Sequence, residues 1–152
     1  MRTLITGGLV ITAADELPVD VLVEDEMVVA LGTGQGWTAD TVIDASGKYV
    51  IPGGVDGHTH MEMPFGGTFA IDTFETGTRA AAWGGTTTIV DFAIQSMGGT
   101  LREGLDAWHA KAEGQCAIDY AFHMILADVN EGSLKEMEQL VGEGVTSFKM
   151  FM

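Results

Sequence analysis

From residue 53 onward, short apolar runs alternate with helical segments, and this alternation constrains the fold more than any other feature. Strands are expected at 55–60, 86–93, 120–127 and 147–152, and helices at 74–83, 101–113 and 133–141. Gly84-Gly85 ends the first helix, Thr100 is a candidate N-cap for the second, and Ser133 and Glu136 have capping-box spacing in the third. Alternation of strands and helices predicts a parallel sheet with right-handed crossovers.

Two architectures fit this pattern: an open doubly wound sheet and a (β/α)8 barrel. No glycine-rich dinucleotide fingerprint follows the first strand, which disfavours a nucleotide-binding doubly wound sheet. A barrel needs eight strands over roughly 250 residues, and this chain supplies only four expected strands. The last of them is apolar at 148–152 and no turn signal follows, so we expect the chain to be part of a longer protein.

The first fifty residues have a different pattern, that of an all-β module. A hairpin is expected around Gly7-Gly8, and a second pair of strands, 19–24 and 27–31, turns at Asp25-Glu26. Further strands at 41–44 and 49–51 flank a Ser-Gly turn. The Pro-Gly-Gly run that starts at residue 52 marks the boundary between this module and the alternating segment.

Composition narrows the partners and the setting. Seven Lys and Arg face 22 Asp and Glu, and the formal charge of -15 argues against nucleic acid and anionic membranes as partners. The single cysteine, Cys116, permits no internal disulfide, fits a cytoplasmic setting and is expected to be a packing residue. The N-terminus lacks signal-peptide features, and no apolar run reaches the roughly 18–20 residues of a membrane helix.

The motif that indicates chemistry is His58-Thr59-His60, at the expected C-terminal end of a strand. Strand geometry sends both imidazoles to one face, about 6–7 Å apart, where they could bind one ion. The end of the strand is where barrel enzymes place their sites. An isolated pair of this kind is more often a chance feature of a polar strand end. Flanking glycines at 53, 54 and 57 favour a site, because they let the backbone approach it closely.

Lys149 is the second unusual residue, since it interrupts the apolar strand at 147–152. Strands of a parallel barrel are covered on both faces, so this amine is expected to be buried. Desolvation would lower its pKa, and the neutral amine could take up CO2 to form a carbamate that bridges two metal ions. The simpler interpretation is a lysine whose amine reaches solvent at the strand end.

These residues belong to longer segments that resemble one family. The run ASGKYVIPGGVDGHTHMEMPFGG at 45–67 resembles the hydantoinases and dihydropyrimidinases of the amidohydrolase superfamily. The same resemblance holds for DTFETGTRAA at 72–81, GGTT at 84–87, DFA at 91–93 and TSFK at 146–149. It extends over essentially the whole chain in order.

The resemblance implies an α/β fold in which 1–52 is an incomplete β-sandwich segment and 53–152 is the first half of a (β/α)8 barrel. It implies two divalent ions, usually zinc, with His58 and His60 on the more buried ion and carboxylated Lys149 bridging both. A hydroxide between the ions would attack the ring amide carbon. The remaining ligands, an aspartate general base and a tyrosine for the oxyanion would lie beyond residue 152, and the whole protein would be a homotetramer or homodimer.

The resemblance also suggests a substrate-facing loop at 62–72. Met63, Phe65 and Phe151 are candidates for an apolar wall that faces the ring substituent, although ordinary loop packing explains them equally well. Three other polar residues are not expected to be ligands: Asp91 as a polar strand-end residue, His123 as a core or supporting residue, and His109 as a solvent-facing helix residue.

The function implied is a hydrolase of non-peptide C–N bonds that opens 5-substituted hydantoins or dihydropyrimidines to N-carbamoyl amino acids. Allantoinases and dihydroorotases typically carry Arg two residues after the histidine pair, where this chain has Glu62. Scaffold relatives of dihydropyrimidinase typically lose ligand histidines, whereas His58, His60 and Lys149 are present. A cyclic amidase of those related classes, and a non-catalytic fragment or scaffold, stay as alternatives, and the 152-residue chain alone is expected to be inactive.

Overall fold

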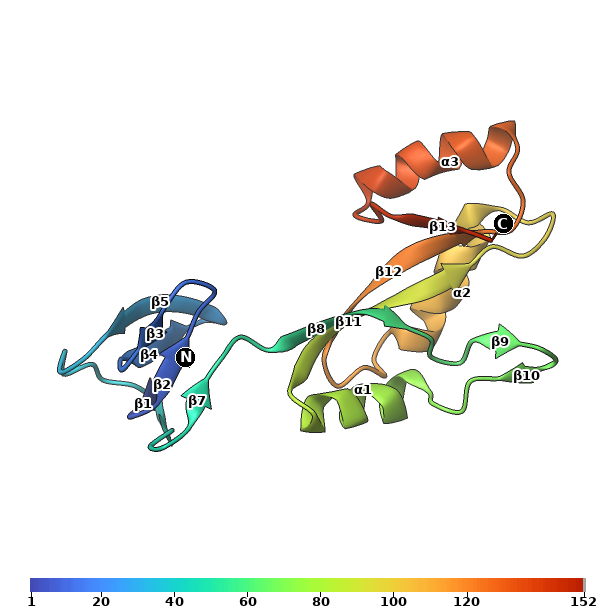
Figure 1. Ribbon diagram of the computed structural model, residues 1–152. Coiled ribbons are helices and arrows are strands. Elements are labelled where there is room, and N and C mark those ends of the chain that lie inside the picture. The colour runs from blue at the N-terminus through green and yellow to red at the C-terminus, as the bar shows by residue number, and fades with distance from the viewer. Residues whose placement is uncertain (152) are drawn as a thin grey trace. The chain divides into compact units, whose positions relative to one another are not determined.

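The computed structural model describes residues 1–151 and forms two compact units, Met1–Pro52 and a second that begins at Gly53 (Figure 1). The first unit contains two small sheets. One has the strand order β5-β4-β1-β6, formed by Met27–Gly32, Asp20–Glu24, Arg2–Thr6 and Thr41–Asp44. The other has the order β3-β2-β7, formed by Glu16–Leu17, Leu9–Ile11 and Tyr49–Val50. Within residues 1–151, no helix is long and apolar enough to cross a membrane.

The turn at Asp25-Glu26 joins β4 and β5 as an antiparallel hairpin, which confirms that expected pair of strands. Both turn residues have positive φ, 46° and 70°, as two-residue hairpin turns require. The hairpin expected at Gly7-Gly8 is wrong, because β1 and β2 belong to different sheets. Those glycines let the chain cross from one sheet to the other: a Cβ on Gly8 would come within 2.6 Å of the Val50 side chain.

The second unit is built on a four-stranded parallel sheet with the order β13-β12-β11-β8. Its strands are Gly54–Thr59 (β8), Thr86–Ile94 (β11), Asp119–Leu126 (β12) and Phe148–Met150 (β13), and its helices are Phe74–Trp83 (α1), Leu101–Ala112 (α2) and Glu131–Gly142 (α3). Neighbouring strands in the sheet follow one another in the chain with no reversal of order. A doubly wound sheet has such a reversal, so this sheet is the curled wall of a half-barrel (Figure 1).

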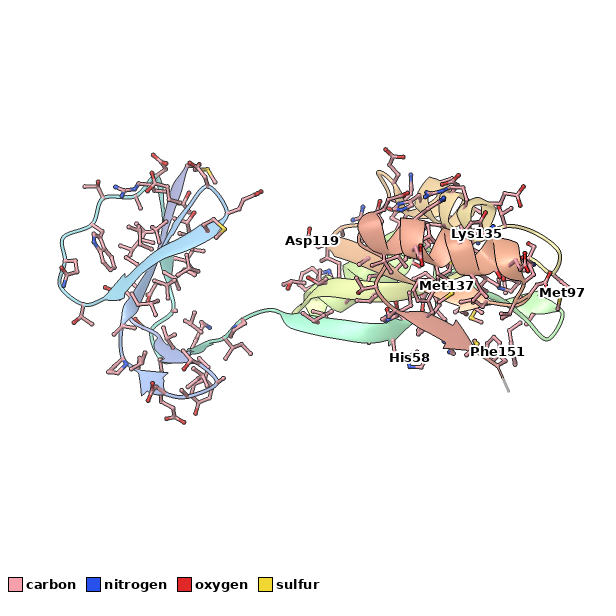
Figure 2. The ribbon with its side chains drawn as sticks, turned by 90° about the horizontal axis from the view of Figure 1, so that it is seen from above. His58, Met97, Asp119, Lys135, Met137 and Phe151 are labelled. Carbon is pink, nitrogen blue, oxygen red and sulfur yellow. The ribbon has the colours of Figure 1, made fainter. Side chains whose placement is uncertain are left out.

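The core of this unit lies between the sheet and its helices. Phe74 of α1, Leu105 of α2 and Leu140 of α3 join one buried apolar cluster with Ile89 of β11 and Met124 of β12. Every second residue of the two central strands therefore faces the helices, and the residues between them face the inside of the curled sheet. Figure 2 shows His58 and Phe151 along one side of this unit and α3, with Lys135 and Met137, along the other.

The third helix begins earlier than its sequence pattern predicts. Asn130 is the N-cap, and its side chain accepts hydrogen bonds from the amides of Gly132 and Ser133 at 2.8 and 3.1 Å. Ser133 is the third residue of this capping box and not its cap, so the expected pairing with Glu136 is wrong. The Glu136 carboxylate instead accepts from the amide of Leu101 at 2.7 Å, which connects α3 to the start of α2.

Helix α2 packs most closely on the sheet at Gly104, where there is no room for a side chain. A Cβ at this position would lie 2.6 Å from the Ile94 carbonyl oxygen and 2.8 Å from Met124 Cε. We expect Gly104→Ala to destabilise the full-length gene product by about 1–3 kcal/mol, because the backbone of β11 would have to move. Gly142→Ala is the control, since nothing lies within 4 Å of its Cβ. Denaturant unfolding measures both, and equal midpoints for the two variants would contradict this packing.

Candidate active site

The register of the four parallel strands determines which side chains share the inner face. Thr59 pairs with Asp91, Phe92 with His123, and Ile125 with Lys149. Paired residues point to the same side of a sheet and adjacent residues point to opposite sides. The inner face therefore collects one polar cluster around an aromatic ring: His58, His60, Phe92, His123 and Lys149.

The Phe92 ring lies at the centre of this cluster and contacts its other members. Its ring centroid lies 4.9 Å from that of His58, 5.0 Å from that of His60 and 4.7 Å from that of His123. The Lys149 amine lies 4.3 Å from the same centroid. The His58 and His60 rings are 5.1 Å apart and nearly perpendicular. The structure thus brings together the three residues that sequence analysis selected as ligands, over one buried ring.

His60 has the environment of a neutral imidazole. Its Nδ1 atom is buried and has no hydrogen-bond partner within residues 1–151. Burial, together with the positive charge of Lys149, lowers the pKa of His60, and the negative charge of Asp91 opposes this shift. The neutral form is the one that binds a metal ion. His60 lies one residue beyond the end of β8, whereas His58 lies within that strand and is exposed.

Lys149 extends from β13 over two aromatic rings, 4.3 Å from the Phe92 centroid and 5.4 Å from that of Phe151. No ion pair between side chains of the described residues includes it. Lys149 is half-buried on this four-stranded wall, and its burial inside a closed barrel stays a prediction. The expected strand also shortens to Phe148–Met150, and residue 152 lies outside the described residues.

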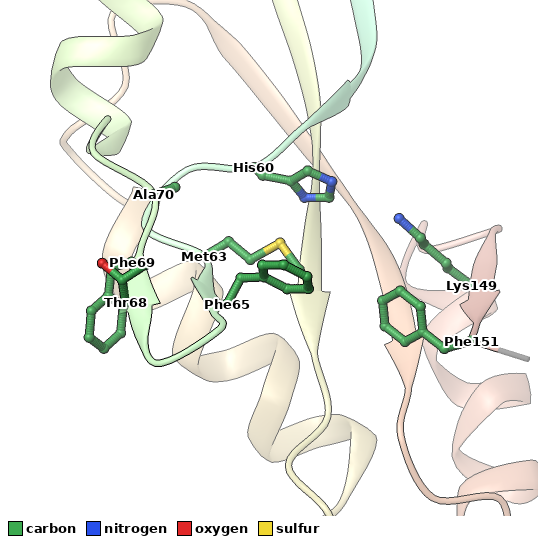
Figure 3. A pocket seen from close by; sticks show the side chains of 8 residues that line it. All are labelled: His60, Met63, Phe65, Thr68, Phe69, Ala70, Lys149 and Phe151. Atoms are coloured by element: carbon green, nitrogen blue, oxygen red, sulfur yellow. The ribbon is translucent and has the colours of Figure 1, made fainter.

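The segment after His60 forms one wall of a pocket. The short strands Pro64–Phe65 (β9) and Thr68–Phe69 (β10) pair as a hairpin. The pocket has a volume of about 480 Å³ and is lined by His60, Met63, Phe65, Thr68, Phe69, Ala70, Lys149 and Phe151. Figure 3 shows the Lys149 amine pointing toward the His60 imidazole, with the apolar side chains beside them. All three residues that were candidates for the apolar wall line this pocket.

The base of the loop is fixed at Glu62, which has a φ of 51° although it is not glycine. Its amide donates to the Asp72 carbonyl at 2.9 Å, and its own carbonyl accepts from the Lys111 amine at 3.4 Å. The Glu62 carboxylate accepts from the amide of Phe74 at 3.4 Å, at the start of α1. The side chain is therefore used to hold the loop, and it is not among the residues that line the pocket.

A sequence model described as the amidohydrolase family matches residues 49–151. The chain belongs to this family. It is 76% identical to a D-hydantoinase of Streptomyces coelicolor, covering 99% of this chain and 33% of that protein. It is 45% identical to a D-hydantoinase of Geobacillus stearothermophilus, covering 100% of this chain and 32% of that protein.

Among solved structures, a dihydropyrimidinase from Brevibacillus agri superposes with a TM-score of 0.97 at 50% identity, covering 100% of this chain and 33% of that one. The chain thus spans about a third of the length of the relatives it matches. The comparisons confirm the expected fold class, the first half of an amidohydrolase barrel preceded by a small β-sandwich segment.

In this amidohydrolase chain, the described part contains no group of three or more His, Cys, Asp or Glu side chains placed to hold a metal ion. The donors on the inner face are two imidazoles and an amine. An amine that remains protonated offers no lone pair, so Lys149 could act as a ligand only after losing its proton or reacting. The partnerless Nδ1 of His60 and the pair of rings 5.1 Å apart fit a metal-binding role.

Asp91 is the residue whose importance sequence analysis missed. It was expected to be a polar strand-end residue, but it lies inside β11 and is completely buried. Its carboxylate accepts four hydrogen bonds, two of them from Thr59 and Met61, which flank His60. The signal was present in the sequence, since a carboxylate inside a run as apolar as TTTIVDFAI must have buried partners.

The other polar residues have supporting roles in the structure. His123 donates from Nε2 to the Gly57 carbonyl at 3.0 Å, and its Nδ1 accepts from the Ser147 hydroxyl, so it connects β8 to the residue before β13. His109 is exposed on α2, as expected. Cys116 packs half-buried against the core, and burial raises the pKa of its thiol, which suits a packing residue.

Proposed function

We propose that the protein carrying this chain is a metal-dependent hydrolase that opens 5-substituted hydantoins or dihydropyrimidines to N-carbamoyl amino acids. The observation that carries the proposal is the pocket on the inner face, which has His60 and Lys149 on its polar side and mainly apolar side chains elsewhere. A ring amide bearing an apolar substituent has the same division into a polar and an apolar part. The identity to D-hydantoinases supports this choice of substrate.

His58, His60 and Lys149 are the residues that would hold the metal, for which we propose two zinc ions. The Lys149 ammonium would first lose one proton to solvent; the neutral nitrogen would then bond the carbon of CO2 and lose a second proton, so a cation becomes an anionic carbamate. Phe92 beneath the three side chains excludes water from one side. Two divalent ions held there would lower the pKa of a water molecule towards about 7 and polarise the amide carbonyl.

The pocket walls would position the substrate. Met63 and Phe65 on the β9–β10 hairpin and Phe151 after β13 provide apolar surface for the ring substituent, while the amide faces His60 and Lys149. At the position where dihydroorotase-like enzymes carry an arginine, this chain has Glu62, whose carboxylate accepts from the Phe74 amide at the start of α1.

The proposal includes the setting of the whole protein: a cytoplasmic homotetramer or homodimer in which 1–52 forms part of a β-sandwich and 53–152 part of the barrel. The single cysteine supports a reducing compartment. Light scattering on the full-length gene product measures the assembly, and we expect a mass of two or four protomers. A monomer at working concentration would contradict the oligomer.

The ligand role is tested with His58→Asn, His60→Asn and Lys149→Met in the full-length gene product. We expect each variant to lose at least one metal ion by elemental analysis and at least about a hundredfold in kcat for hydantoin opening. His109→Asn is the matched control, because it removes an exposed imidazole on α2. A wild-type protein that binds two ions but opens neither a hydantoin nor a dihydropyrimidine ring would refute the proposed activity, and one that neither binds two ions nor opens a ring would favour a scaffold.

The pocket is tested by comparing a 5-aryl hydantoin with unsubstituted hydantoin. Phe65→Ala removes one apolar wall, so kcat/KM for the aryl substrate should fall by about tenfold while the small substrate is little affected. Trp83→Ala is the control, since this indole on α1 is 93% exposed and lies outside the pocket lining. Equal losses for the two substrates would show that Phe65 does not contact the substituent.

A further inference from the structure

We infer that Asp91 is a positioning residue that fixes His60 by clamping the two residues on either side of it. This inference rests on the proposed role of His58 and His60 as metal ligands. His60 lies beyond the last residue of β8, Thr59, so the hydrogen-bond ladder of the sheet does not hold it. Its geometry must come from other contacts.

Asp91 supplies these contacts through one oxygen. Asp91 Oδ2 accepts from the Thr59 hydroxyl at 2.9 Å and from the Met61 amide at 2.8 Å. Both donors belong to residues adjacent to His60, one on each side. The side chains of Thr59 and Asp91 point away from the imidazoles, so the clamp holds the backbone of His60 from the helix side without occupying the inner face.

The other oxygen fixes the carboxylate itself. Asp91 Oδ1 accepts from the Phe92 amide at 2.8 Å and from Trp108 Nε1 of α2 at 3.1 Å. With two donors on each oxygen, the plane of the carboxylate is determined. Trp108 is held in turn by the Lys111 amine, 4.1 Å from its ring centroid, and that amine also donates to the Glu62 carbonyl. Helix α2 thus secures the segment through Glu62.

A packing role alone does not explain this arrangement. Asp91 is 0% exposed, and no Lys or Arg side chain of the described part forms an ion pair with it. Burying a carboxylate is costly, and an apolar side chain of similar volume often serves a core equally well or better. What the carboxylate provides, and an apolar residue cannot, is four acceptor positions directed at the segment that carries His60.

The substitution Asp91→Asn changes the hydrogen bonds of this side chain while keeping its volume nearly the same. Three of the four partners of Asp91 are N–H groups that can only donate, and they lie on both oxygens, so the amide nitrogen of asparagine must face at least one such donor whichever way it is turned. Thr78→Val is the matched control. Thr78 is equally buried, donates to the Phe74 carbonyl and accepts from the Ala117 amide at 3.0 Å, all away from the histidines.

The experiment titrates metal-free, full-length protein with Co²⁺ and follows its visible absorption, with kcat, KM and thermal unfolding measured alongside. For Asp91→Asn we expect affinity for Co²⁺ to fall by about 10–100-fold and kcat to fall while KM changes by less than about twofold. Trp108→Phe, which removes one donor, should show a smaller change in the same direction. Thr78→Val should lower the unfolding temperature and leave Co²⁺ affinity unchanged.

Two results would overturn the inference. In the first, wild type binds Co²⁺ and Asp91→Asn binds it equally well, or loses affinity only as much as Thr78→Val does, so Asp91 is a core residue and the proposed function stands. In the second, wild type binds no Co²⁺, which refutes the ligand role of the histidines and the positioning role with it. If Asp91→Asn does not fold, Thr59→Val and Trp108→Phe decide the question by the same titration.

Discussion

Parallel pairing of β8, β11, β12 and β13, with a shift of register between β8 and β11 at Ile89–Asp91, determines which side chains can meet on the inner face. Because side chains alternate along a strand, a slip of one residue would send His58 and His60 into the helix layer and bring Thr59 to the inside. The same register places Asp91 among the buried residues that face α2. Site and core are therefore two consequences of one set of backbone hydrogen bonds.

The helices stabilise this register from one side only. Phe74, Leu105 and Leu140 bury the outer face of the sheet, and apolar burial of this kind is the main favourable contribution to folding. On both faces, specific polar contacts among the described residues hold the end of β8. Asp91 fixes the end of β8 from the helix side, and His123 fixes it from the inner side through the Gly57 carbonyl.

Much of the fold, and the shared face of the two histidines, could be predicted because both follow from local periodicity. The alternation of strands and helices predicted the parallel sheet, the resemblance to hydantoinases selected a barrel over a doubly wound sheet, and the two-residue spacing of His58 and His60 predicted their shared face. The predictions that were wrong concerned features that depend on contacts between residues far apart in the sequence. Gly7-Gly8 has the local signature of a hairpin, but the pairing of β1 with β4 and β6 decides that it is a crossing. Glu136 has the spacing of a capping box, but Asn130 and Leu101 determine its actual role.

Asp91 shows why a site is harder to predict than a fold. Periodicity places it on the helix-facing side of β11, where a carboxylate has no favourable place unless donors are already there. Those donors come from β8, from the segment after it and from α2. Their distances from Asp91 along the sequence follow no pattern that would predict the contacts. The histidines on the inner face can be recognised by their chemistry, whereas the buried carboxylate that positions His60 is recognised only by its partners. A buried polar residue in an apolar strand can therefore position a functional residue whose side chain lies on the opposite face of the sheet.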